Sequence, residues 1–296
     1  MDRTQIVACL IVGLWVGGIV GCTKESPITV GSKNFTEQVI LGEIVAQHLE
    51  HRLGRRVDRK LNLGGTMLAH QALVAGDIDL YPEYTGTALT TILKLPSTSD
   101  PAAAMALVRA EYHTRFGVEW MEPLGFNNTF AMVIRGKDAR KSKTATLSEA
   151  ALYSPGWILG VGYEFQQRSD GLAGLLKTYH LPILGSPQTM DLGLLYKALE
   201  QQQVNMVAGN ATDGQLSVLD VLVLKDDKRY FPPYDCALAV RSKSLEANPP
   251  LRQALTELAG LFTDLSMRKL NYQVDAAHRP VREVAEQFLR DAGLRR

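Results

Sequence analysis

From residue 28 onward, short runs of β-type residues alternate with longer runs whose apolar residues recur at helical spacing. The first short run, 28–30, is followed by a helical stripe over 39–49. The second, 57–63, leads through the turn 64–66 into a helical run that Gly76 closes, and 77–80 forms a third. Strands that alternate with helices in this way predict a parallel sheet with crossover helices, and so an α/β fold.

Two polar segments directly follow predicted strands, and both are candidate binding loops. Residues 32–34 read Ser-Lys-Asn, and residues 80–87 read LYPEYTGT. Because Pro82 and Gly86 are unsuited to an ordinary buried strand, we predict that the second segment is a loop. In open α/β sheets ligands bind outside the carboxyl ends of the strands, which places both loops beside a binding site. Asn34, three residues before Glu37, is the expected N-cap of the first helix.

The same alternation restarts after residue 125 and indicates a second α/β unit. We expect strands at 130–135, 157–161, 204–208 and 221–224, and a helix from 163 through 179. A capping box at Thr146 and Glu149 opens another helix. After Pro232 and Pro233, a strand at 236–241 and helices at 249–267 and 281–292 complete the chain. Two such units predict two lobes with a cleft between them.

Residues 1–22 differ from the rest of the chain. An apolar run from Ile6 to Val20 follows a short charged start, and about 15 apolar residues suit the h-region of a secretory signal better than a membrane span. The segment from Ile19 to Cys22 resembles a bacterial lipobox, whose cysteine is lipidated. We therefore expect 1–22 to be a signal peptide, Cys22 to carry lipid, and the protein to be an exported lipoprotein, periplasmic or at the cell surface. An uncleaved N-terminal anchor helix is the alternative, and either would tether the chain to a membrane.

Composition and motifs argue against several classes of function. A formal net charge of +1 gives no field that would attract nucleic acid. Cys236 lies in a strand-like apolar run, which indicates a buried structural thiol. The sequence has no nucleophile elbow and no Walker-type phosphate loop, and His48 and His51 lack an evident third metal ligand. We therefore predict no catalytic residues, no cofactor and no metal.

Six motifs together carry a family resemblance: GSKNFTEQ (31–38), GDIDLYPEYTGT (76–87), GFNNTFA (125–131), EFQQRSDG (164–171), ATDG (211–214) and DDKRYFPPY (226–234). In this order they resemble the substrate-binding lipoproteins of osmoprotectant ABC importers, of the glycine betaine, choline and carnitine type. The resemblance implies a two-lobed periplasmic-binding-protein fold of type II, with the ligand cleft between the lobes. It also implies a small-molecule solute, a membrane permease and a cytoplasmic ATPase as partners.

The lobe boundaries rest partly on this resemblance. We expect residues 28–125 and 235–296 to form lobe 1, because the chain would cross back at Pro232 and Pro233, and residues 126–234 to form lobe 2. We also expect the protein to be a monomer.

The resemblance assigns roles to the polar loops. A quaternary ammonium group donates no hydrogen bonds, so proteins bind it against the faces of aromatic rings. By resemblance, Tyr84 and Tyr234 are walls of such a cage, and Thr87 donates a hydrogen bond to the ligand. Lys33 and Arg168 would face a carboxylate on the same ligand.

Two positions depart from the family pattern. Phe130 stands where betaine binders commonly have a cage tyrosine, and it keeps the ring face without the hydroxyl. Asn210 replaces another such tyrosine, which removes a wall and supplies an amide. The sequence therefore predicts a quaternary-ammonium or zwitterionic compatible solute, and leaves open one that is larger or more polar than betaine. A sensory binding protein of the same fold, which serves a receptor, is the alternative function.

Each assigned residue also has an ordinary structural interpretation. Lys33 is a solvated cation near a helix start, Arg168 pairs with a glutamate one helical turn earlier, and Asn210 satisfies backbone groups in a turn. Glu83 and Asp213 are expected to hold their own loops together rather than contact solute.

Overall fold

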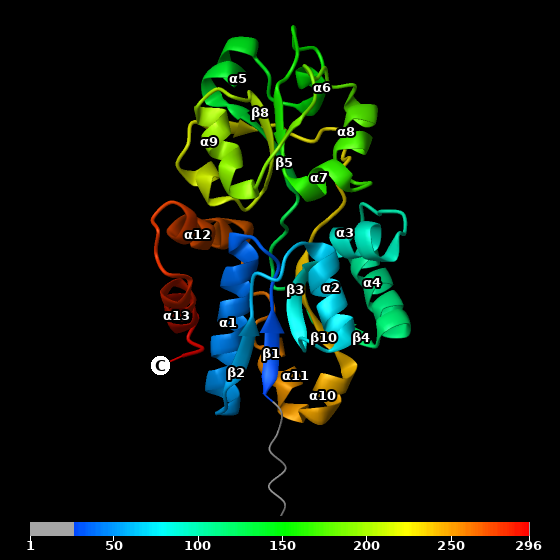
Figure 1. The fold of residues 1–296 in the computed structure, drawn as a ribbon, viewed down its shortest axis with the longest axis vertical. Coiled ribbons are helices and arrows are strands. Elements are labelled where there is room, and N and C mark those ends of the chain that lie inside the picture. Colours follow the sequence, from blue (N-terminus) through cyan, green and yellow to red (C-terminus); the bar gives the residue numbers. More distant parts are fainter. Residues whose placement is uncertain (1–26, 296) are drawn as a thin grey trace, which may run out of the picture.

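The structure of the protein is a computed structural model, and it describes residues 27–295. The chain forms two five-stranded sheets, each covered by helices, which lie one above the other in Figure 1. We call the units built on them the first and the second lobe. Within residues 27–295 no helix is long and apolar enough to cross a membrane. The predicted signal peptide and Cys22 lie outside the described residues.

The first sheet has the strand order β2-β1-β3-β10-β4. Its strands are β1 (Ile28–Gly31), β2 (Val57–Lys60), β3 (Leu80–Tyr84), β4 (Val118–Trp120) and β10 (Cys236–Arg241). β1 runs parallel to β2 and β3, whereas β10 runs antiparallel to β3 and β4. The first lobe thus takes a central strand from a distant part of the chain.

The second sheet has the order β7-β6-β8-β5-β9. Its strands are β5 (Phe130–Arg135), β6 (Leu159–Val161), β7 (Gln188–Thr189), β8 (Met206–Asn210) and β9 (Val221–Val223). β6 is parallel to β7 and β8, and β5 is antiparallel to β8 and β9. Both sheets are therefore mixed rather than purely parallel. In each, the antiparallel strand is the one that directly follows a crossing from the other lobe.

Helices cover both faces of the first sheet. They are α1 (Thr36–Leu53), α2 (Thr66–Ala75), α3 (Thr85–Thr87), the π-helix η1 (Ala88–Leu93), α4 (Pro101–Phe116), α10 (Ser242–Ala247), α11 (Pro249–Thr256), α12 (Asp264–Asp275) and α13 (Val281–Asp291). α1 is buried along most of its length because it lies between the sheet and α11, α12 and α13. The C-terminal helices thus complete the core of the first lobe.

The second lobe carries shorter helices. They are α5 (Gly136–Ser142), α6 (Leu147–Ala150), α7 (Tyr163–Gln167), α8 (Leu172–Tyr179), the 3-10 helix η2 (Leu192–Leu194), α9 (Leu195–Glu200) and the 3-10 helix η3 (Gly214–Ser217). The predicted capping box is confirmed, since Thr146 and Glu149 exchange side-chain to backbone hydrogen bonds at the start of α6.

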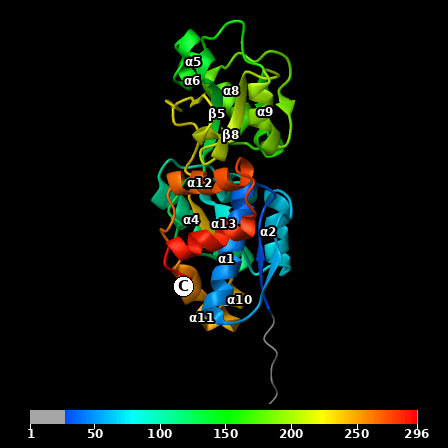
Figure 2. The ribbon, with the colours of Figure 1, turned by 90° about the vertical axis from the view of Figure 1, so that its left-hand side faces the viewer.

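Two chain segments join the lobes and lie side by side. The Asn128 N–H donates to the Tyr234 carbonyl at 3.1 Å, and Asn127 pairs with Asp235 in an isolated antiparallel bridge. The expected lobe boundaries, at 125/126 and 234/235, fall within these segments and remain a prediction. Beside them, α12 lies at the end of the first lobe that faces the second lobe, where it packs on η3 (Figure 2).

The segment LYPEYTGT differs from its prediction as a loop. Residues 80–84 form the buried strand β3, and residues 85–87 begin a helix. β3 pairs with β1 only at Leu80 and is otherwise paired with β10 alone. Pro82 is tolerated because the other edge of the strand needs no hydrogen bond from it.

Three further local predictions were wrong. α1 begins at Thr36 with Phe35, not Asn34, at the N-cap. The helix expected over 163–179 is interrupted between Gln167 and Leu172, because Arg168 has an extended backbone conformation. The helix expected over 249–267 is likewise two helices, α11 and α12. Cys236 is fully buried, as predicted.

Candidate functional site

The junction between the lobes holds a buried ionic cluster centred on Asp170. Arg168 donates from Nε to one oxygen of Asp170 at 2.8 Å and from Nη2 to the other at 2.5 Å. The Tyr234 hydroxyl and the Thr90 hydroxyl also donate to Asp170, at 2.5 and 2.7 Å. Arg168 Nη1 reaches Thr87 Oγ1 of the first lobe at 2.9 Å. This cluster joins the loop after α7 in the second lobe to α3 and η1 in the first.

The charges of this pair survive burial because the two groups stabilise each other. Burial opposes the charged form of Arg168, but the hydrogen bonds with Asp170 outweigh it and raise the pKa of the guanidinium. Burial likewise raises the pKa of Asp170, but the hydrogen bonds and charge of Arg168 outweigh this effect and leave its pKa lowered. An ionised pair at the junction follows.

Aromatic rings surround the guanidinium of Arg168. Its central carbon lies 5.0 Å from the ring centroid of Phe130 and 5.5 Å from that of Tyr234. These two rings meet edge to face with their centroids 5.6 Å apart. The two distances from the guanidinium carbon to the ring centroids are within the range of a cation–π interaction. The ring faces predicted to bind a ligand's cation thus hold a cation of the protein itself.

Lys33 and Tyr84 form a second cluster, within the first lobe. The Lys33 ammonium donates to Glu83 at 2.5 Å and to Thr66 Oγ1 at 3.1 Å, and it lies 5.1 Å from the Tyr84 ring centroid. The Tyr84 ring in turn stacks with Phe35, with 6.3 Å between centroids. Lys33 is buried, so its interpretation as a solvated surface cation is wrong.

Glu37 is the centre of a third set of contacts, and its hydrogen-bond partners among residues 27–295 are all uncharged. Its Oε1 accepts from the Tyr84 hydroxyl at 2.7 Å and from Asn128 Nδ2 at 2.8 Å. Its Oε2 accepts from Asn271 Nδ2 at 3.1 Å and from the Thr212 hydroxyl. Burial raises the pKa of Glu37, and these hydrogen bonds only partly offset the effect. One carboxyl group therefore connects the first lobe, the crossing segment and the second lobe.

Asn210 lies at the end of β8, directly opposite Phe130 in the strand register. Its backbone N–H donates to Asp213 Oδ2 at 2.8 Å, and the Tyr196 hydroxyl donates to the same oxygen at 2.8 Å. Burial raises the pKa of Asp213 to about 6. Asp213 thus holds its own loop, in keeping with the structural interpretation of that residue.

The structure brings four of the seven predicted ligand-binding residues into one cluster: Thr87, Phe130, Arg168 and Tyr234. Lys33 and Tyr84 lie together in the neighbouring cluster, and Asn210 pairs with Phe130. Sequence reasoning missed Asp170 and the bridging role of Glu37. Asp170 could have been found, because it lies two residues after a cation inside the EFQQRSDG motif.

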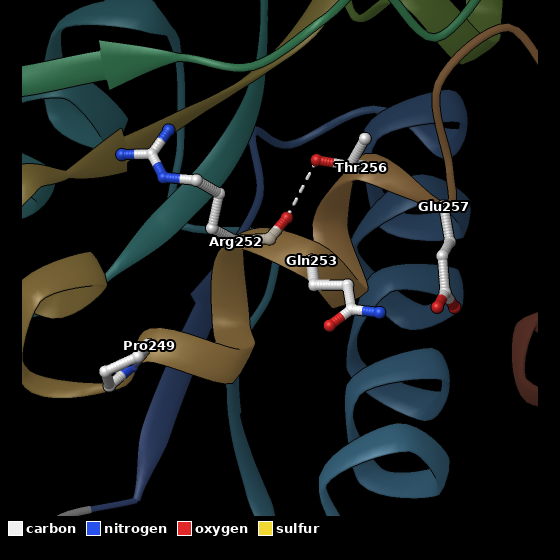
Figure 3. A pocket seen from close by; sticks show the side chains of 5 residues that line it. All are labelled: Pro249, Arg252, Gln253, Thr256 and Glu257. Carbon is white, nitrogen blue, oxygen red and sulfur yellow. Dashed lines mark hydrogen bonds between the residues drawn. The ribbon is translucent and has the colours of Figure 1, made fainter.

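Other concavities are lined by residues of the first lobe alone. One is a surface pocket on α11, lined by Pro249, Arg252, Gln253, Thr256 and Glu257 (Figure 3). Another is lined by Met67, His70, Gln71, Val74, Ala75, Ile92 and Phe116. Neither includes a predicted ligand-binding residue. Within residues 27–295, no group of three or more histidine, cysteine, aspartate or glutamate side chains is placed to hold a metal ion.

Comparison with known proteins gives the family. The family model described as the substrate-binding domain of ABC-type glycine betaine transport systems matches residues 26–291. The chain is 37% identical over 273 residues to the ergothioneine transport permease/ergothioneine binding protein of Helicobacter pylori, covering 92% of this chain and 48% of that protein. It therefore spans about half the length of that relative.

Two further relatives match over most of their length. The carnitine transport binding protein of Listeria monocytogenes is 32% identical, with 92% of this chain and 88% of that protein covered. The glycine-betaine-binding protein of Pseudomonas aeruginosa is also 32% identical, with 99% and 94% covered.

Solved structures agree with this assignment. The crystal structure of a glycine betaine/carnitine/choline ABC transporter protein superposes with a TM-score of 0.76 at 30% identity, and covers 90% of this chain and 99% of that one. The predicted two-lobed binding-protein fold and family resemblance are thereby confirmed. The chain belongs to the family of substrate-binding domains of ABC-type glycine betaine transport systems.

Proposed function

We propose that this chain is the extracytoplasmic solute-binding component of an ABC importer. It captures a quaternary-ammonium or zwitterionic compatible solute between its lobes and delivers it to a permease that a cytoplasmic ATPase drives. Residues 1–22 would act as the signal peptide for export, and lipid on Cys22 would tether the mature chain to the membrane. The protein would act as a monomer. The relatives are named as transport binding proteins, which supports a function without catalysis.

The observation that carries the proposal is the position of Arg168 against Phe130 and Tyr234. Two ring faces in a buried junction hold a guanidinium, so they are suited to a desolvated cation. A ligand's quaternary ammonium would take these faces together with Tyr84. Arg168, Lys33 and Thr87 would then turn toward the ligand's carboxylate.

Closure of the lobes would make the binding selective. A ligand that contacts both lobes shifts the population toward the closed arrangement by its differential affinity for that arrangement. The Arg168–Thr87 bond already joins the lobes, so displacing Arg168 onto a ligand carboxylate would keep a bridge in place. The permease would then receive only the closed, loaded form.

The aromatic rings available to bind the ligand's cation indicate the class of ligand. Asn210 leaves the cage one ring short beside Phe130, so a trimethylammonium group alone gains fewer cation–π contacts. A bulkier zwitterion can recover that loss through polar contacts with the Asn210 amide. Ergothioneine and carnitine, for which two relatives are named, are therefore the first solutes to test.

A thermal-shift screen of residues 23–296 against glycine betaine, choline, carnitine and ergothioneine tests the proposal. A solute at 100 times its dissociation constant adds about 2.7 kcal/mol of stability, and we expect an increase in Tm of about 5–10 °C. The variant F130A should lose most of that shift, because it removes a ring face. The control Y163A removes an exposed tyrosine in the same lobe and should keep it. A panel in which no solute raises the Tm would contradict the proposal.

Genome context separates the importer from the sensory alternative. Neighbouring genes for a permease and an ATPase would support import. A neighbouring receptor gene without either would support a sensory binding protein.

A further inference from the structure

A contact between the lobes that uses none of the predicted ligand-binding side chains lies at the N-terminus of α2. Glu164, on α7 of the second lobe, accepts a hydrogen bond from the Thr66 backbone N–H at 2.6 Å through Oε1. The Thr66 hydroxyl donates to Oε2 at 3.0 Å. The first N–H groups of a helix have no partner within the helix, and a carboxylate also interacts favourably with the helix dipole there. Glu164 of the second lobe therefore supplies the side-chain hydrogen-bond acceptor that the N-cap residue of α2, Gly65, cannot provide.

The backbone of the first lobe is shaped for this approach. A Cβ atom on Gly65 would lie 2.6 Å from Glu164 Oε1, closer than side-chain carbons normally come to an oxygen. Gly65 has φ −73° and ψ −176°, which any residue adopts without strain. The turn therefore does not need glycine for its conformation, and the close approach of Glu164 is the reason for the small residue.

The contact is electrostatically favourable as well. Glu164 Oε2 lies 3.9 Å from Arg168 Nη1, and the Thr66 hydroxyl that it accepts from is also held by the Lys33 ammonium. The carboxylate of Glu164 thus meets the N-terminus of α2 and the Lys33–Thr66 pair of the first lobe, and Arg168 of its own lobe lies beside it. The side chain of Glu164 is 44% exposed, so each interaction is weaker than in the buried Arg168–Asp170 pair.

From this geometry we infer that Glu164 is an interlobe latch, a positioning residue that does not contact the solute. It stabilises the arrangement described here, with the lobes in contact, which we take as the closed one. The latch raises the fraction of closed protein before ligand arrives. Because apparent affinity scales with the fraction of protein in the binding-competent state, it strengthens binding of every ligand by the same factor. This inference rests on the proposed function only for its effect on affinity, since the contact itself exists without a ligand.

Two variants break the latch from opposite sides. E164A removes the carboxylate, and G65A keeps it but fills the space that its oxygen occupies. Their controls are E246Q, which neutralises an exposed glutamate on α10, and G193A, at a glycine whose Cβ would meet no atom within 4 Å. Small-angle scattering of the ligand-free proteins should show a larger radius of gyration for E164A and G65A than for the wild type and both controls. Hydrogen exchange at the Thr66 amide should be faster in the same two variants.

Calorimetry on any solute that binds gives the second measurement. We expect E164A and G65A each to weaken binding about tenfold, the size of one hydrogen bond to a charged group at a partly exposed site. The factor should be the same for every solute, and the double variant should be no weaker than either single one. Ligand-free variants as compact as the wild type, a changed order of solutes, or additive losses would each overturn the latch. A wild type that binds no solute while E164A still expands would contradict the proposed function alone.

Discussion

Asn210 and Phe130 face each other across the β5–β8 pair, so a side chain at 210 lies on the same face of the sheet as the Phe130 ring. The variant N210Y would restore the wall that the family resemblance places there. A further ring face is worth about 0.5–2 kcal/mol to a bound cation, so glycine betaine should bind about 2- to 30-fold more tightly. Titration calorimetry measures this gain. F130Y is the control, since it adds a hydroxyl without a new ring and should change affinity little. Unchanged binding of glycine betaine by N210Y would mean that position 210 is outside the cage.

Single residues also show where prediction from sequence succeeds and fails. Arg168, Thr87, Phe130 and Tyr234 could be placed together because each lies in one of the motifs that carry the family resemblance. Glu37 could not, because its role depends on Thr212 and Asn271, which only the tertiary fold brings to it.

At the scale of elements, the local sequence pattern predicted most strands and helices. It failed where contacts between side chains or strands, rather than local propensity, determine the backbone conformation. β3 contains Pro82, which is a poor strand residue by itself, yet it is buried because β10 pairs with one of its edges. That partner lies more than 150 residues away in the sequence, and no local signal identifies it. The break after α7 has a local cause instead, since the hydrogen bonds from the Arg168 side chain to Asp170, two residues later, accompany an extended backbone at Arg168.

The packing of α12 on η3 gives a prediction at this scale. A Cβ atom on Gly214 would lie 2.5 Å from the backbone nitrogen of Tyr272, so G214A must displace one of the two elements. Overpacking of this kind costs about 1–3 kcal/mol, and urea denaturation should show an earlier unfolding midpoint with an unchanged slope. G193A, in the same lobe but in open space, is the matched control. If G214A unfolded at the wild-type midpoint, α12 and η3 would not be tightly packed in solution.

For the whole molecule, the pH dependence of stability follows from carboxyl groups buried between and beside the lobes. Burial raises the pKa of Glu37, and it raises that of Asp213 to about 6. A carboxyl group whose pKa is higher in the folded than in the unfolded protein binds its proton more tightly when folded. Its contribution to stability is therefore complete below its unfolded pKa and is lost as the pH rises through its folded pKa. Both groups should make the protein less stable as the pH rises from about 4.

The variant E37Q isolates the part due to Glu37. Glutamine has no proton to lose in this pH range, and its side-chain oxygen can still accept a hydrogen bond. Between pH 5 and pH 8 the stability of the wild type relative to E37Q should fall, by about 1.4 kcal/mol for each unit by which the folded-state pKa of Glu37 exceeds 5. His48 and His70, whose lowered pKa values act in the opposite direction, are present in both proteins and cancel in the difference. Thermal unfolding of both proteins from pH 5 to pH 8 measures this difference in stability. A constant difference would mean that Glu37 is already ionised at pH 5 in the folded protein, and so that burial does not raise its pKa.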